Sequence, residues 1–469
     1  MTAMDVLVIP LIAAAACALP IGTLARPLAV FAGLLTVAAA GVSAWVGVSP
    51  FESVVWAGPL GAQLAVGMDG MSTALLMLSG VLFATGAAAS GGVRSPRAYF
   101  ALWSLLQATV AGVLIARDLI LFFAFWEALL VPLTLLLWHW GGADRRAVTS
   151  RLLLSWMCGS ALLLTGILAL GVGARTFALA DLGGYRLAEG SQVLLALLFL
   201  GAFAVRLPLF PLHAWQSRAY VTAPLPLAIV LAGIISKTAI YGIARICLPL
   251  FPRGMADLAP YLIALATVGA LYGALLAMRQ RDTRTFIAYA TLSQVDFIAL
   301  GVFVGSPEGR AGALIASVSH GLVVAMLFLL AGSLARRLGS FGLGTGGVAS
   351  RAPVLMAFFI AAVLTLIGVP GTSGAPGDVL ILASVFARSA GVGLIAALVM
   401  ILSAGYGLVL LRTVFFGPVA ATAEGSDLRW RERALLIPLL VLVIAFGVAP
   451  RIIGDLAERD VPAITGPGR

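Results

Sequence analysis

Leu231-Ala-Gly-Ile-Ile-Ser-Lys-Thr-Ala-Ile-Tyr-Gly242 is a mostly apolar stretch with one charged side chain near its centre. Lys237 is the only lysine in the chain, so the other residues counted among the 29 Lys+Arg are arginines. A desolvated lysine can release its proton, whereas an arginine keeps its charge at any accessible pH. The alternative is a helix-end lysine that reaches the lipid headgroups, but apolar sequence continues on both sides. The stretch therefore predicts a membrane helix in which Lys237 gains and loses a proton.

The composition excludes a soluble domain. The chain has 469 residues, of which 61% are hydrophobic and 10% charged, and its mean hydropathy is +1.10. These values are typical of a polytopic membrane protein with a single membrane domain. The net charge of +10 does not indicate nucleic-acid binding, because the arginines lie in short loops. The three cysteines have no ligand spacing, so the sequence indicates neither disulfides nor a metal site.

The apolar pattern predicts an all-α protein with about fourteen membrane-spanning helices, at roughly 20 residues per span. Arginines concentrate in alternate loops, which predicts that those loops face the cytoplasm and that both termini lie outside. The first span lacks a positive segment before it, so we expect a membrane helix there and not a signal peptide. The expected spans are 5–24, 28–48, 66–90, 98–116, 119–138, 150–172, 191–216, 224–248, 259–278, 284–304, 310–335, 353–388, 391–414 and 433–450.

Two of these spans contain residues that a continuous helix cannot accommodate. Pro208 and Pro211 interrupt the seventh, and prolines and glycines from Gly368 to Gly377 interrupt the twelfth. Broken helices within a bilayer are tolerated where they are buried in protein or line a wet cavity. The breaks are five spans apart, which predicts two inverted five-helix repeats, helices 4–8 and 9–13. The corresponding segments are 1–97, 98–248 (first repeat), 259–414 (second repeat) and 415–469.

Several acidic and basic residues lie inside the predicted spans. Glu127 lies in an aromatic helix, where we expect it to be buried and paired with Lys237 or Arg206 from another helix. Arg206 precedes the break in the seventh helix, and Asp378 lies just beyond the break in the twelfth. Asp69, at the start of the third span, is expected to be a helix cap more than a transport residue.

Helices 10 and 11 add two more candidate proton-transfer residues. Asp296 is an acid within helix 10, and His320 of helix 11 is a plausible proton relay because a histidine pKa lies near neutrality. A core histidine bonded to a neighbouring helix is the alternative for His320. His213, beside the first break, is at least as consistent with a structural role as with proton transfer.

Several ordered motifs lie between about Val66 and Arg412. They are Phe125-Trp-Glu-Ala-Leu-Leu-Val-Pro132, Pro211-Leu-His-Ala-Trp215, the stretch around Lys237, Asp282-Thr-Arg-Thr-Phe-Ile-Ala-Tyr289, His320-Gly-Leu322 and Gly368-Val-Pro-Gly-Thr372. In these motifs the chain resembles the antiporter-like membrane subunits of proton-pumping respiratory complex I, of the chain M or mitochondrial subunit 4 type.

The resemblance implies a proton route that uses the helix-5 glutamate, the helix-8 lysine, the helix-11 histidine and the helix-12 acid. These are Glu127, Lys237, His320 and Asp378. It also implies fourteen helices and no cofactor in this chain, with redox chemistry in partner subunits of a multisubunit NADH–quinone oxidoreductase. The location implied is the bacterial inner membrane.

The sequence departs from the family at several of these positions. Arg206 replaces the helix-7 lysine, Asp378 replaces a glutamate, Gln294 replaces a histidine, and Asp296 is an additional acid. These changes indicate a divergent paralogue.

The sequence therefore predicts a proton-translocating membrane subunit of a complex I-like pump, with Glu127, Arg206, Lys237, Asp296, His320 and Asp378 along the proton path. One alternative is the membrane subunit of a related hydrogenase, cation/proton antiporter or inorganic-carbon uptake complex. A second alternative is a scaffold subunit with a degenerate channel, in which Arg206 is a locked charge.

Overall fold

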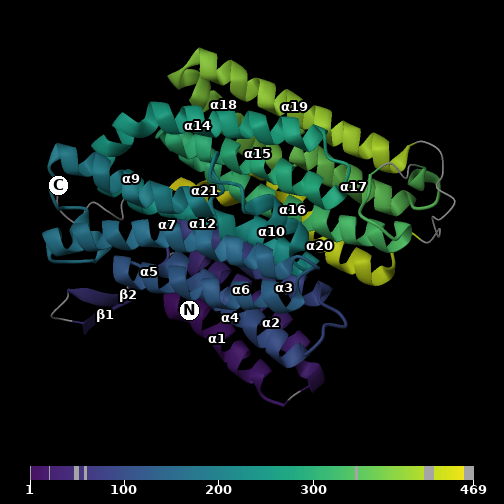
Figure 1. Cartoon of the computed structure of the whole chain (residues 1–469), viewed down its shortest axis with the longest axis horizontal. Helices are drawn as coiled ribbons and strands as arrows, with labels where there is room; N and C mark the ends of the chain where they lie inside the picture. Colours follow the sequence, from purple (N-terminus) through teal and green to yellow (C-terminus); the bar gives the residue numbers. More distant parts are fainter. Residues whose placement is uncertain are drawn as a thin grey trace. The chain divides into compact units, whose positions relative to one another are not determined.

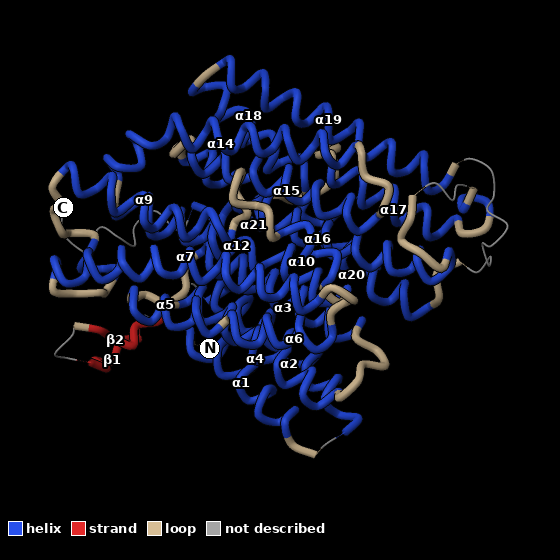
Figure 2. The backbone as a smooth tube through the Cα atoms, viewed as in Figure 1, coloured by secondary structure: helices blue, strands red, loops and turns tan. Residues whose placement is uncertain are grey.

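The structure, a computed structural model, describes residues 2–20, 22–46, 52–57, 61–343, 347–416 and 427–458. Helices make up most of this part of the chain (Figure 2). Ten of the described helices are long and apolar enough to cross a membrane, which confirms the prediction of a polytopic helical membrane protein. Parts of the predicted cytoplasmic loop and tail, residues 417–426 and 459–469, lie outside the described residues.

Some other apolar helices are not long and apolar enough to cross a membrane on their own. Three are shorter, namely Ala3–Ala18, Gly190–Arg206 and Pro353–Leu366. The last two helices, Trp430–Val448 and Arg451–Ala457, pass the test only as a pair that is bent by 71°.

The prediction of an all-α chain is wrong between the second and third spans. Strands β1 (Glu52–Ala57) and β2 (Ala62–Val66) pair antiparallel there as a hairpin, drawn in red in Figure 2. Alternating and β-branched residues favour strands, but the segment is too short to be recognised beside the apolar spans. The hairpin ends at Val66, three residues before the cap of the next helix.

The described chain divides into two compact units. Figure 1 labels most of the helices and strands that make them up. Unit 1 comprises Met1–Leu207, Ile234–Tyr261 and Asp455–Arg469. In it α2 packs on α3, α1 on α4, and α7 on α9. Its elements are α1 (Ala3–Ala18), η1 (Gly22–Leu24), α2 (Ala25–Val46), β1, β2, α3 (Gly70–Ala89), α4 (Pro96–Ile115), α5 (Leu119–Ala128), α6 (Leu130–Trp140), α7 (Arg145–Ala174), α8 (Leu179–Leu182), α9 (Glu189–Arg206), α12 (Ser236–Gly242), η4 (Ile243–Cys247) and α13 (Leu248–Leu250).

Unit 2 comprises Pro208–Gly233 and Leu262–Gly454. Its central helix, α16, is buried along most of its length and packs against α15, α17, α18 and α20. Its elements are α10 (Gln216–Thr222), α11 (Leu225–Val230), α15 (Thr283–Phe303), α16 (Pro307–Leu338), η5 (Val348–Ser350), α17 (Pro353–Leu366), α18 (Gly374–Arg388), α19 (Ala390–Phe415) and α20 (Trp430–Val448). Three elements cross the boundary between the units: η3 (Leu231–Ile235), α14 (Pro252–Met278) and α21 (Arg451–Glu458).

Capping side chains determine where several of these helices begin. Asp69 accepts a hydrogen bond from the Ser72 backbone N–H at the start of α3, which confirms its predicted capping role. Asp282 caps α15 in the same way, through the N–H of Thr285. Each cap satisfies a backbone donor that the helix itself leaves free.

Two helices are interrupted where proline and glycine predict a break. The helix α9 ends at Arg206, and residues 207–215 form turns before α10 begins. The second interruption separates α17 from α18. Gly368 and Gly371 have φ of +70° and +89° there, a backbone conformation that favours glycine. Arg206 directly precedes the first break, and Asp378 lies in the first turns of α18 after the second.

The span that contains Lys237 is not a uniform α-helix. One α-helical segment, α12, lies between two π-helical segments, η3 and η4. Single π-turns inside α-helices occur frequently at functional sites, because they change the direction of neighbouring side chains. The apolar pattern of this segment did not predict them.

Candidate functional site

Lys237 is completely buried on α12 of unit 1. Its ammonium nitrogen lies 3.2 Å from the hydroxyl of Ser236, to which it donates a hydrogen bond. The helix α12 packs against α9, and Gly242 allows the ring of Phe203 to lie directly against its backbone. A lysine in such surroundings is costly unless it serves a function.

Arg206, the last residue of α9, is enclosed by two tryptophans. Its guanidinium carbon lies 3.3 Å from the ring centroid of Trp126 and 4.7 Å from that of Trp156. The guanidinium also donates a hydrogen bond of 3.0 Å to the backbone carbonyl of Trp126. Only 1% of Arg206 is exposed, so these desolvated cation–π contacts contribute on the order of 2 kcal/mol. The two rings hold Arg206 as a fixed cation inside unit 1.

Glu127 is not fully buried, contrary to the expectation from its aromatic helix. It is partly exposed on α5, between the exposed residues Ala124 and Ala128. Arg206 is close enough to interact electrostatically with Glu127. Among the described residues, however, no Lys or Arg nitrogen lies within 4.0 Å of its carboxylate. The expected direct ion pair is therefore absent from this part of the chain, and one carboxylate oxygen is buried without a hydrogen-bond partner.

A buried ion-pair cluster that the sequence did not predict lies at the start of α3. Asp69 lies 2.8 Å from Arg117 and 3.0 Å from Arg245, and all three side chains are nearly inaccessible. Burial alone would raise the pKa of Asp69, but the charges of Arg117 and Arg245 and the Ser72 N–H outweigh it and lower the pKa to about 2. Asp69 therefore stays ionised between the two arginines at physiological pH.

Asp296 is completely buried in unit 2, on α15. Its carboxylate lies against the backbone of Gly269 on α14, where a Cβ would come within 1.8 Å of the oxygen. The same spot is close to Phe210, in the turns that follow the break after Arg206. The turns that follow Arg206 thus place the backbone of Phe210 beside the buried carboxylate of Asp296, as expected for a polar site.

Gln294, His320 and Asp378 line one small cavity in unit 2. Gln294 donates a hydrogen bond of 3.1 Å to the carbonyl of Leu366, the last residue before the break in α17–α18. The Asp378 carboxylate lies beside Gly368 within that break. The structure therefore brings together the histidine, the acid and the second interruption.

The six predicted residues divide equally between the two units. Glu127, Arg206 and Lys237 belong to unit 1, whereas Asp296, His320 and Asp378 belong to unit 2. His213, which the sequence left undecided, stacks on Phe210 and contacts the Tyr272 ring. Its ring contacts favour the structural alternative.

Sequence reasoning missed the two tryptophans around Arg206 and the arginines around Asp69. A tryptophan within an apolar helix carries no signal of its own, and Trp156 is far from Arg206 in the chain. The described residues contain no group of three or more His, Cys, Asp or Glu side chains that could hold a metal ion.

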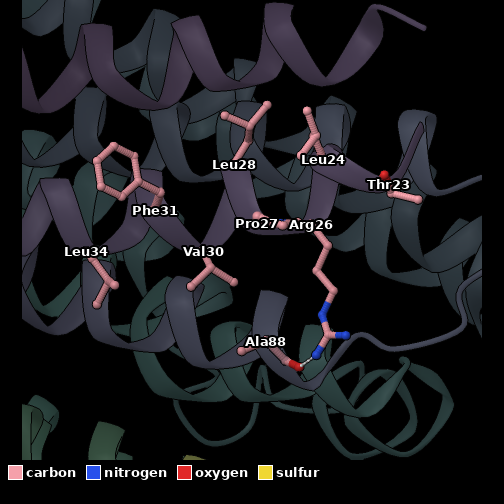
Figure 3. Close-up of a pocket in the computed structure, with 9 residues that line it drawn as sticks. All are labelled: Thr23, Leu24, Arg26, Pro27, Leu28, Val30, Phe31, Leu34 and Ala88. Carbon is pink, nitrogen blue, oxygen red and sulfur yellow. Dashed lines mark hydrogen bonds between the residues drawn. The ribbon is translucent and has the colours of Figure 1, made fainter. Parts of the chain in front are cut away.

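A groove of about 720 Å³ on α2 is separate from these residues (Figure 3). Leu24, Leu28, Phe31 and Leu34 line it, and the Arg26 guanidinium extends to the carbonyl of Ala88 at one end. Its apolar lining is typical of a surface that contacts lipid chains, so we do not assign it to the proton path.

Comparisons with known proteins agree with this arrangement. Residues 116–403 match the family model described as NADH:quinone oxidoreductase/Mrp antiporter, transmembrane. The chain is 34% identical to NAD(P)H-quinone oxidoreductase chain 4 1 of a Synechococcus strain, over 86% of this chain and 79% of that protein. It is 32% identical to NADH-quinone oxidoreductase subunit M of Rhodobacter capsulatus, over 86% and 82%. A chain in the solved structure of respiratory complex I from Thermus thermophilus with bound NADH has a TM-score of 0.91 and 30% identity, over 99% of this chain and 100% of that chain.

Proposed function

Because this chain belongs to the NADH:quinone oxidoreductase/Mrp antiporter transmembrane family, we propose that it carries protons across the membrane as the chain M-type subunit of a redox-driven complex. The observation that carries the proposal is the complete burial of the only lysine, between two π-helical segments. Lys237 is the basic side chain that can cycle its charge. The chain contributes proton transfer, and the redox reaction belongs to partner subunits.

The proposed route uses the six residues in order. Lys237 takes up and releases a proton under the influence of Glu127 and Arg206 in unit 1. The proton then passes through Asp296 and His320 to Asp378 in unit 2. The cavity shared by Gln294, His320 and Asp378 supports the last step, because it joins a titratable ring to an acid at a helix break.

The proposed architecture has fourteen spans in two inverted five-helix repeats. Counting the three shorter apolar helices and the bent pair together with the ten long helices gives fourteen, which supports this number. Helices 7 and 12 of this scheme correspond to α9–α10 and α17–α18, which supports an equivalent role for the two breaks. An even number of spans places both termini on one side, which we propose is the outside of a bacterial inner membrane.

Glu127 provides an argument for partner subunits. It lies in the middle part of the Leu119–Trp140 span and on a face shared with Ala124, Ala128 and Val131, which is 55% exposed. One carboxylate oxygen is buried, but the side chain as a whole is partly exposed, and a charged group that reaches lipid at this depth costs several kcal/mol. We propose that other membrane subunits of a respiratory-type complex cover this face.

Proton pumping by the purified native complex in liposomes tests the function. The complex should acidify the vesicle lumen when NADH and a quinone are supplied, and the co-purifying subunits should include an NADH-oxidising arm. Sodium-driven proton exchange without a redox donor would instead favour the antiporter alternative. Co-purification with a hydrogenase or a carbon-uptake enzyme would favour one of those complexes.

We predict that Glu127→Gln reduces pumping strongly, whereas Glu127→Asp retains part of it. The reason is that Gln cannot carry the negative charge that interacts with Arg206. Pumping per NADH oxidised in liposomes measures the effect, and NADH oxidation itself serves as the control for assembly. Normal pumping by Glu127→Gln would show that a neutral, structural glutamate is sufficient.

We predict that Arg206→Lys is tolerated and that Arg206→Ala moves the pH optimum of pumping upward by about 1.5 units. At an effective dielectric of about 20, a fixed positive charge roughly 8 Å from an amine opposes its protonation by about 2 kcal/mol, which corresponds to about 1.5 pH units. The pH profile of pumping measures the shift. Trp156→Phe is the matched control, because it weakens the stacking on Arg206 but keeps the charge. An unchanged profile for Arg206→Ala would remove Arg206 from the proton path.

The scaffold alternative is favoured by one observation, the enclosure of Arg206. The two tryptophans immobilise a cation that cannot release its proton at the position where the family has a lysine. If the chain were only a scaffold, Lys237 and Asp378 variants would leave the number of protons pumped per NADH unchanged.

A further inference from the structure

The apolar groove on α2 has no part in the proposed proton route. Its lining comes from η1 and the first turns of α2, with Ala88 of α3 at its edge. Three of the lining residues are more than half exposed, namely Leu24 at 56%, Phe31 at 57% and Leu34 at 53%. The volume of about 720 Å³ is in the range of small-molecule sites in other proteins. The groove is therefore large enough to hold part of a lipid molecule.

The groove exists because α3 places only small side chains beside this part of α2. The two helices approach closely at a pair of glycines, since a Cβ at Gly33 would lie 2.8 Å from the carbonyl oxygen of Gly80. The end of α3 reads Ala84-Thr-Gly-Ala-Ala-Ala-Ser90 and holds no large side chain. The space beside Leu28 and Phe31 is therefore not filled from α3.

The length of the groove matches one leaflet of a bilayer. From Leu24 to Leu34 the helix rises about 15 Å, at roughly 1.5 Å per residue. This is about half of the hydrocarbon core, which is roughly 30 Å thick. A membrane helix of a partner would contact α2 along its whole span, whereas the acyl chain of a lipid occupies this depth only. The length therefore favours an acyl chain.

Arg26 places a positive charge at one end of the groove. It is the second residue of α2, its side chain is exposed, and its guanidinium donates a hydrogen bond to the carbonyl of Ala88 (Figure 3). This bond occupies one of the five N–H donors of an arginine. In the described part of the chain, no carboxylate oxygen lies within 4.0 Å of the Arg26 guanidinium. The guanidinium thus keeps donors and a charge that an anionic ligand can use.

The loops at this end of unit 1 carry further positive charge. Arg94 follows α3, Arg97 lies in the first turn of α4, and both are exposed. A hydrogen bond to the carbonyl of Arg94 brings the end of α6 to the same place. The loop after α6 holds one acid, Asp144, but Arg145 and Arg146 follow it directly. This end of the bundle therefore attracts anionic headgroups.

We propose that the groove binds one phospholipid with an anionic headgroup, whose phosphate contacts Arg26 and whose acyl chain lies along Leu24, Phe31 and Leu34. Guanidinium groups bind phosphate through paired, charge-assisted hydrogen bonds. The ligand is a lipid and not a free phosphate ion, because only a lipid also fills the apolar part of the groove. The site does not depend on proton transfer by this chain.

Capping of α3 by Arg26 is the competing explanation, because cationic side chains stabilise the C-terminal ends of helices. A cap needs one N–H donor and no ligand. The variant Arg26→Gln distinguishes the two explanations. Its amide can still donate to the carbonyl of Ala88, but it has no charge with which to hold a phosphate.

The experiment is photo-crosslinking in liposomes that hold the assembled complex. Phosphatidylglycerol, which is anionic, and phosphatidylcholine, which is zwitterionic, carry the same diazirine-labelled acyl chain, and mass spectrometry measures the labelling of residues 24–34. Phosphatidylglycerol should label this segment about tenfold more strongly, the effect of a hydrogen bond to a charged group. Arg26→Gln should remove this preference, and Arg26→Lys should keep most of it. Arg94→Gln is the matched control, because it removes an exposed arginine that does not line the groove.

Three results would overturn the proposal. Equal labelling by the two lipids would mean ordinary contact with bulk lipid. Labelling by neither lipid would mean that a partner subunit covers the groove, and competition by soluble glycerol phosphate would mean a site for free anions. If Arg26→Gln does not assemble, Leu28→Trp fills the groove and should also remove the preference for phosphatidylglycerol. Leu154→Trp, at a residue of α7 that is 64% exposed and outside the groove, should keep it, and equal preferences in this pair would contradict the site.

Discussion

Lys237→Arg is expected to abolish proton pumping while NADH oxidation by the assembled complex continues. The substitution keeps a positive charge at the buried position but replaces a side chain that can release its proton with one that cannot. Pumping per NADH oxidised, measured with the complex in liposomes, should fall to background. Lys237→Ala should give the same result for the opposite reason, because it removes the proton-binding group.

Two controls separate this effect from damage to the fold. Arginine is larger than lysine, and overpacking a fully buried site costs about 1–3 kcal/mol, so the yield and thermal stability of the complex must be compared. Ser236→Ala removes the hydroxyl that accepts from Lys237 without changing any charge, and it should retain most of the pumping. Normal pumping by Lys237→Arg would rule out a cycling proton at this residue.

The interruptions and caps were predictable because they depend on local chemistry. Proline removes a backbone donor wherever it stands, and glycine permits φ angles that other residues avoid, so the breaks near Pro208 and Gly368 could be located from the sequence. Asp69 could be assigned as a cap for the same reason, since its acceptor lies three residues from the N–H that it binds.

Contacts between distant parts of the chain were not predictable in this way. The tryptophans around Arg206 and the arginines around Asp69 come from helices and loops far apart in the sequence. The hairpin and the π-turns beside Lys237 depend on their packing, which a short apolar pattern does not encode. Sequence reasoning therefore identified the residues with unusual chemistry but not what surrounds them.

Glu127 illustrates the limit most clearly. A carboxylate in an aromatic helix predicts burial, but the pattern does not say whether the covering surface belongs to the same chain. In the structure the residue is partly exposed, beside small residues that leave room for a neighbour. Hydropathy alone therefore does not show whether an apolar helix face is covered by the same chain or by a partner subunit.

Asp378→Asn is expected to reduce pumping as severely as the loss of Lys237, because Asn cannot accept and release a proton at the break between α17 and α18. Asp378→Glu keeps a carboxylate at this position and should recover activity. Pumping per NADH in liposomes again measures the effect. If Asp378→Asn pumps normally, the proton leaves by a route that does not include this acid.

Gly368→Ala tests the position of Asp378 without changing any titratable group. A Cβ at Gly368 would come within 2.7 Å of the Asp378 carboxylate oxygen, so the carboxylate must move. Gly371→Ala is the matched control, since Gly371 also has a positive φ, of +89°, but a Cβ there meets nothing within 4 Å. Both substitutions impose a backbone strain of about 1–2 kcal/mol. If the place of the carboxylate matters, Gly368→Ala loses most of its pumping and Gly371→Ala keeps it. Equal losses in the two variants would mean that the strain at the break, and not the position of Asp378, limits proton transfer.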